Sequence, residues 1–209
     1  MFALTDSDLT GTVLDCPGGG SSFTAAAAGR GCDAVAVDPV YADPPDQLAA
    51  RQRDELDRGR VWASTHADRY VWDFYGGVDG HTRTRSAAAQ AFLSDLAARP
   101  DRYRCASLPD LPFPDASFDL VLSSHLLFTY ADRLDLTFHR AALLELVRVS
   151  RRDVRVFPLL DQSGRAMPEM VTSLTDTLAA QGISHRIVPV AYEFQRGGDR
   201  MLVLHRSPH

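Results

Sequence analysis

Short apolar runs alternate with helix-like stretches along this chain, and that alternation limits its fold more than any other feature of the sequence. Strands that alternate with helices usually pair in parallel, with helices on both faces of the sheet. The pattern therefore predicts a doubly wound α/β fold. Strands are expected at residues 12–15, 34–38, 103–106, 118–123 and 154–157, and helices at 23–28, 138–149 and 170–178.

The C-terminal part of the chain predicts a hairpin. The segment Arg196-Gly197-Gly198-Asp199 separates two apolar runs, 187–194 and 201–205. Two strands around a Gly-Gly turn are typical of antiparallel pairing. We therefore expect a mostly parallel sheet of seven strands with an antiparallel strand at its C-terminal end.

The interval between the second and third strands, residues 41–102, is much longer than one crossover helix requires. Residues 43–45 resemble a helix start, and 88–96 carry apolar residues at helical spacing. Between them, Thr65 and Asp68 could cap a further helix that carries the aromatic stretch 70–75. We expect this helical insertion to form a lid above the ligand-binding edge of the sheet.

Charge and hydropathy indicate which classes of partner the chain is not expected to bind. The net charge is −5, and acidic and basic residues are mixed without a basic stripe, so nucleic acid is not expected. No stretch approaches the ~18 apolar residues of a membrane span. The N-terminus lacks the basic start and apolar run of a secretory signal, so we expect a cytoplasmic protein, monomeric or homodimeric.

Two residue counts exclude particular chemistries. All 22 basic residues are arginine, which excludes Schiff-base lysines and the lysine of a phosphate-binding P-loop. Cys16, Cys32 and Cys105 have neither disulfide nor zinc-site spacing, and we expect them to be small buried apolar groups. Carboxylates do not cluster at the strand ends, so no metal is predicted.

A glycine-rich turn joins the first strand to the first helix. It runs from Asp15 through Gly18-Gly19-Gly20, and Asp38 ends the second strand 23 residues after Asp15. Glycines let the backbone approach a ligand, and a carboxylate at the end of the next strand can accept hydrogen bonds from ribose hydroxyls. The pattern indicates a nucleoside-binding site, although a tight turn followed by a helix-capping Asp would also explain it.

These residues resemble a known family. Asp15–Ser21 is similar to the Asp-x-Gly-x-Gly motif of class I S-adenosylmethionine-dependent methyltransferases. Residues 111–121 closely resemble the Leu-Pro-Phe-x-Asp-x-Ser-Phe-Asp-x-Val segment of the small-molecule branch of that family. The resemblance implies one Rossmann-like methyltransferase domain over 1–209, with 41–102 as its lid, that transfers a methyl group to a small acceptor and releases S-adenosylhomocysteine.

The same resemblance assigns cofactor contacts residue by residue. It implies residues that contact the methionine end, the ribose and the adenine of the cofactor, and residues that lie beside its sulfonium. Pro17 replaces the usual first glycine, and Ser107 replaces a frequent Asp at the adenine edge. The cofactor-binding residues expected in this way are Asp15, Pro17, Gly18, Gly19, Asp38, Pro39, Ser107, Leu108, Ser123 and Ser124.

Methyl transfer needs a positioned nucleophile and, for a poor nucleophile, a proton acceptor. His125 follows the fourth strand and is the leading candidate base, although it could equally cap the next helix. Tyr130 is a weaker catalytic candidate. His139 sits on a packed helix, where a structural role is favoured over a catalytic one.

The insertion supplies the candidate substrate-binding residues Tyr70, Trp72, Tyr75 and His81. They could form an aromatic pocket for a planar or apolar acceptor, and packing of the lid on the sheet explains them as well. His81 together with Arg83 and Arg85 could contact an anionic acceptor, whereas the similar number of acids nearby favours a solvated face.

Two alternative functions remain at this point. A cofactor-binding protein without turnover, acting as a sensor or partner subunit, fits the replacements at Pro17 and Ser107. A nicotinamide-dependent oxidoreductase would share the glycine turn and Asp38, but the lysine of its frequent Tyr-x-x-x-Lys pair is absent.

Overall fold

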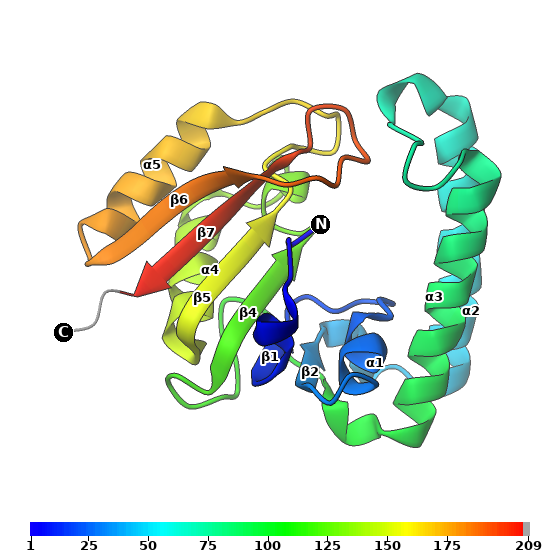
Figure 1. The fold of residues 1–209 in the computed structure, drawn as a ribbon, viewed down its shortest axis with the longest axis horizontal. Coiled ribbons are helices and arrows are strands. Elements are labelled where there is room, and N and C mark those ends of the chain that lie inside the picture. Colours follow the sequence, from blue (N-terminus) through cyan, green and yellow to red (C-terminus); the bar gives the residue numbers. More distant parts are fainter. Residues whose placement is uncertain (207–209) are drawn as a thin grey trace.

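The computed structural model describes residues 1–206 and contains one seven-stranded sheet (Figure 1). The strand order is β3-β2-β1-β4-β5-β7-β6. The first five strands are parallel, and β7 runs antiparallel to both β5 and β6. The predicted mostly parallel sheet is confirmed. Its strands are β1 (Thr12–Asp15), β2 (Asp33–Val37), β3 (Tyr103–Arg104), β4 (Phe118–Ser124), β5 (Ser150–Phe157), β6 (Ile183–Pro189) and β7 (Arg200–Arg206).

Helices cover both faces of the sheet because neighbouring strand residues point in opposite directions. Leu14 packs into the core beneath α4 (Leu136–Val149) and α5 (Pro168–Ala179). Val13 packs on the other face, in a cluster that includes Ala27 of α1 (Phe23–Ala28). The doubly wound arrangement predicted from the sequence is therefore confirmed.

The segment from Leu111 to Asp119 fastens the sheet to α4. The Leu111 N–H donates to Glu145 at 2.7 Å, and Arg148 reaches Asp115 at 2.8 Å. At the far end of the segment, Asp119 accepts the backbone N–H of Thr12 at 2.9 Å and so joins β4 to β1. The most specific sequence motif of this chain thus has a structural role at the amino ends of β1 and β4.

The insertion between β2 and β3 contains two long helices, α2 (Pro45–Thr65) and α3 (Val78–Ala98). They pack against each other and stand beside the sheet, at the right of the view in Figure 1. The helical insertion and the start near residue 45 are confirmed. The prediction of a helix that carries residues 70–75 is wrong, because Thr65 still belongs to α2 and only a short 3-10 turn, Ala67–Arg69, follows.

Two predicted strands and the predicted burial of one cysteine also differ from the structure. The first hairpin strand was expected at 187–194 but spans Ile183–Pro189, and the connection to β7 contacts the insertion instead of extending the ladder. β3 has only two residues, Tyr103–Arg104. Cys105, expected to be buried, is exposed, whereas Cys16 and Cys32 are buried.

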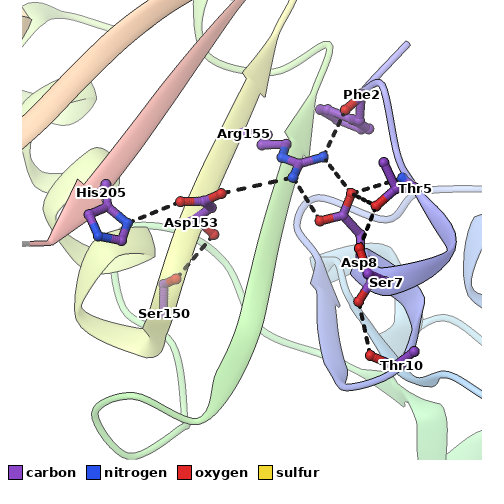
Figure 2. A network of polar contacts seen from close by, with 9 residues as sticks. All are labelled: Phe2, Thr5, Ser7, Asp8, Thr10, Ser150, Asp153, Arg155 and His205. Atoms are coloured by element: carbon purple, nitrogen blue, oxygen red, sulfur yellow. Dashed lines mark hydrogen bonds and ion pairs between the residues drawn. The ribbon is translucent and has the colours of Figure 1, made fainter.

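Arg155 of β5 holds the N-terminal segment against the sheet (Figure 2). Its guanidinium donates to the Phe2 carbonyl at 3.0 Å and to the Asp8 carboxylate at 2.8 Å. Burial alone would raise the pKa of Asp8, but hydrogen bonds from Thr5 and Arg155 hold that pKa below its usual value. None of the helices within residues 1–206 is long and apolar enough to cross a membrane.

Candidate functional site

A cavity of about 1250 Å³ lies at the carboxyl edge of the parallel strands. The turn after β1, the ends of β4 and β5, both insertion helices and the β6–β7 connection contribute to its lining. Pockets for one small ligand usually measure roughly 300–1000 Å³. This cavity is therefore large enough for a cofactor together with a second small molecule.

The glycine turn approaches its neighbours too closely to carry side chains. A Cβ on Gly18 would lie 2.5 Å from the Tyr41 hydroxyl oxygen and 2.8 Å from the Ala36 Cβ. Gly19 has a φ of 50°, in the left-handed region that glycine adopts at little cost. The Tyr41 hydroxyl donates to the Gly19 carbonyl at 2.8 Å and holds the turn in place.

Asp38 joins the end of β2 to the glycine turn. Its carboxylate accepts the Gly19 N–H at 2.9 Å and the Val40 N–H at 3.0 Å. Burial raises the pKa of the Asp38 carboxyl, although these two donors and Arg51 act in the opposite direction. Asp38 and the glycine turn, which the sequence associated with a nucleoside ligand, are therefore joined directly by a hydrogen bond.

Asp15 lies beneath the turn and is almost completely buried. Burial, followed by the negative charge of Asp38, raises its pKa to about 7. The carboxyl group is thus near half-protonation at neutral pH, and a cation placed beside it would favour the charged form.

His125 follows β4 with a φ of 53°, which is unusual for a residue with a side chain. Its backbone N–H donates to the Phe157 carbonyl at 2.9 Å and holds this conformation. His125 borders the cavity, and its side chain is exposed there. The protein walls around the cavity reduce hydration of the ring, and this desolvation, followed by the positive charge of Arg85, lowers the pKa of His125 to about 4, so that the neutral ring is favoured at pH 7.

Aromatic side chains from the insertion and from the β6–β7 connection pack together in an aromatic cluster. His81 stacks on Phe194 with 4.6 Å between ring centroids, and the hydroxyl oxygens of Tyr75 and Tyr192 are 2.7 Å apart. Five of these side chains also line the cavity and form what we call its aromatic wall. The cluster comprises Tyr70, Trp72, Phe74, Tyr75, His81, Tyr192 and Phe194, and the wall comprises all of these except Trp72 and Phe74.

Main-chain hydrogen bonds join the same two segments, and we call this pair of bonds the clasp. The Val71 N–H donates to the Phe194 carbonyl at 2.7 Å, and the Arg196 N–H donates to the Arg69 carbonyl at 3.0 Å. The insertion is therefore attached to the far side of the sheet by backbone as well as by aromatic packing.

Comparisons with known proteins agree with this geometry. A family model described as a methyltransferase domain matches residues 58–157. An uncharacterized protein of Methanocaldococcus jannaschii is 28% identical over 99% of this chain and 90% of its own length. The resemblance to class I S-adenosylmethionine-dependent methyltransferases is confirmed. The family match covers just under half of the chain: most of the insertion and the strands β3 to β5, beginning after the glycine turn and Asp38.

Solved methyltransferases share the fold at low sequence identity. The magnesium protoporphyrin IX methyltransferase of Synechocystis superposes with a TM-score of 0.52 at 15% identity, over 97% of this chain and 77% of the other. A methyltransferase of Methanosarcina mazei gives a TM-score of 0.50 at 11% identity, over 95% and 93% of the two chains. These likenesses establish the architecture of the methyltransferase domain.

The structure brings most of the site residues expected from the sequence to the cavity. Asp15 and Ser123 are buried beneath it, and Leu108 belongs to the core. Trp72, Pro39 and Ser107 lie outside its lining. The expected residues that line the cavity are Pro17, Gly18, Gly19, Asp38, Ser124, His125, Tyr130, Tyr70, Tyr75 and His81.

Sequence reasoning missed Tyr192 and Phe194, which border the cavity. Both were assigned to a strand, and no local pattern places that segment against the insertion. Arg85, considered with His81 and Arg83 as a possible contact of an anionic acceptor, follows His81 by four residues on one face of a helix, and both line the cavity. His139 is buried, with Nδ1 2.8 Å from the Asp135 carbonyl oxygen, in agreement with the structural role expected for it.

Proposed function

We propose that this protein binds S-adenosylmethionine at the carboxyl edge of the sheet and transfers its methyl group to a small-molecule acceptor by in-line displacement. The observation that carries this proposal is the contact between Asp38 and Gly19 at the border of one cavity. A ribose bound by Asp38 would then lie beside the open turn that is suited to the rest of the cofactor.

The residues present fit such a cofactor. A carboxylate has about four acceptor positions, so two remain on Asp38 for ribose hydroxyls after Gly19 and Val40 have donated. The Thr129 hydroxyl at the cavity is buried without a hydrogen-bond partner among residues 1–206, so a ligand could satisfy it. The magnesium protoporphyrin IX methyltransferase of the same fold binds S-adenosylmethionine and S-adenosylhomocysteine in its crystals.

The cofactor would supply a methyl group activated by a positively charged sulfur. The residues of the chain would orient the two ligands and exclude water from the site. Asp15, buried below the glycine turn, would favour the cationic methionine end. His125, neutral at pH 7, offers a ring nitrogen that accepts a hydrogen bond or a proton from the acceptor. Tyr130 borders the same part of the cavity, and the aromatic wall excludes water.

Calorimetry with S-adenosylhomocysteine and with NAD tests the proposal. We expect saturable binding of the first and none of the second. Asp38→Asn should weaken that binding at least tenfold, because the neutral amide replaces one ribose acceptor with a donor. Asp33→Asn at the exposed start of the same strand is the matched control and should bind like the wild type. Binding of NAD alone, or equal binding by the two variants, would overturn the assignment.

A further inference from the structure

One face of α3 presents a single positive charge to the cavity. His81, Arg85 and Ala88 line it at spacings of four and three residues, which is one stripe of a helix. His81 belongs to the aromatic wall, and Arg85 follows one turn later. Arg85 and the wall residue His81 are therefore neighbours on one helix face, with their Cβ atoms about 6 Å apart.

Arg85 is an exposed side chain at the border of the cavity, and among residues 1–206 no carboxylate lies within 4.0 Å of its guanidinium. By contrast, Arg58 at the same cavity pairs with Glu55 at 2.6 Å. Asp57 also borders the cavity but makes no ion pair with Arg85. The positive charge lowers the pKa values of both His81 and His125, after the larger effect of burial.

Arg85 lies away from the part of the cavity assigned to the cofactor. Gly20 of the glycine turn faces Gln52 of α2, whereas Arg85 contacts Gly59 of the same helix. Seven residues of α-helix span about 10 Å along the axis. The guanidinium is therefore displaced by about that distance from the turn, toward the aromatic wall.

We propose that Arg85 binds the anionic group of the methyl acceptor and that this acceptor is a small aromatic acid whose ring lies against the aromatic wall at Tyr75, His81 and Tyr192. This inference rests on the proposed methyl transfer. A flat ring gains contact area on such a wall, and a guanidinium binds a carboxylate with two parallel hydrogen bonds. An acid group attached directly to a ring or through one carbon would keep the charge and the ring on one small molecule, as the adjacency of Arg85 and His81 on α3 requires.

Matched acid and amide probes test this proposal on the protein saturated with S-adenosylhomocysteine. The probes are benzoate, 4-hydroxybenzoate, 1-naphthoate and indole-3-acetate, each compared with its neutral primary amide by ligand-observed NMR and calorimetry. We expect at least one acid to bind ten times more tightly than its amide. Arg85→Gln should abolish that preference, whereas Arg83→Gln, an exposed charge on the same helix outside the cavity lining, should retain it.

Three outcomes would overturn the proposal: equal binding of acids and amides, failure of every acid to bind, and persistence of the acid preference in Arg85→Gln. If the preference persists while the variant loses affinity for S-adenosylhomocysteine, Arg85 instead holds the carboxylate of the cofactor. Binding of S-adenosylhomocysteine by the wild type is measured first. If the wild type does not bind it, the proposed function itself is wrong, and the preference for acids over amides can still be measured on the free protein.

Discussion

At the scale of single residues, the cavity shifts the ionisation of an acid and a base in opposite directions. Asp15 has a pKa of about 7 because burial and Asp38 disfavour its charge, and His125 has a pKa of about 4 because burial and Arg85 disfavour its charge. Both groups therefore favour neutral forms in the free protein. A cationic ligand beside Asp15 and an anionic one beside Arg85 would each reverse part of this effect.

Replacement of Asp15 by Asn should stabilise the free protein in a pH-dependent way. With its pKa raised in the fold, Asp15 contributes stability that is fully present below about pH 4 and is lost as pH rises through about 7. The amide resembles the neutral acid, so Asp15→Asn should melt on the order of 5 °C higher than the wild type at pH 8 and nearly the same at pH 4. Thermal unfolding at both pH values measures this. A constant difference, or the same pattern in the exposed control Asp33→Asn, would contradict it.

At the scale of elements, the clasp and the hydroxyl pair of Tyr75 and Tyr192 attach the insertion to the β6–β7 connection at the border of the cavity. The segment from Tyr70 to Gly77 has no helix or strand of its own, and Gly76 and Gly77 both have positive φ angles. The contacts with the β6–β7 connection therefore set its position. Segments held in this way open at lower free energy than core strands.

Tyr192→Phe should loosen this attachment without unfolding the domain. Loss of one partly buried hydroxyl pair costs about 1 kcal/mol locally, so hydrogen exchange should accelerate severalfold in residues 69–78 and 190–198. Mass-spectrometric exchange measures this by segment. Tyr103→Phe removes a hydroxyl bonded to Asp95 and is the control. Equal exchange in the two segments for both variants would contradict a role of the pair in closure.

Elements that depend on local pattern were predictable from the sequence. The strands β1, β4 and β5 and the helices α4 and α5 follow apolar spacing because one side of each packs on the core. The stretch 70–75 resembled a helix because it is rich in apolar aromatics, yet its partners are Tyr192 and Phe194, more than a hundred residues away. Only the three-dimensional fold brings these two segments together. Asp38 and the glycine turn were recognisable because strand ends of a parallel sheet converge at one edge.

At the scale of the whole molecule, the two ends of the chain meet on β5. Arg155 holds Asp8 near the N-terminus, and Asp153 of the same strand contacts His205 of β7 at 3.1 Å (Figure 2). The Arg155 and Asp8 side chains are only 11% and 16% exposed. Their pairing therefore contributes more than a surface ion pair.

Arg155→Gln should destabilise the entire domain by about 2 kcal/mol, because it leaves the Phe2 carbonyl without its donor and the Asp8 carboxylate without its cationic partner. Urea unfolding at pH 7 measures the loss. Arg155→Gln combined with Asp8→Asn should lose less than the sum of the single variants, since the second substitution removes the unpaired charge. Additive losses would show that the two side chains do not stabilise each other.

The clasp also has a consequence for the sequence of events during turnover. It bridges the insertion to the β6–β7 connection beside Tyr70 and Phe194, which line the same cavity as the glycine turn. The proposed acceptor, held there by Arg85, would narrow the path to the glycine turn. That arrangement would favour a turnover in which the cofactor binds first and leaves last.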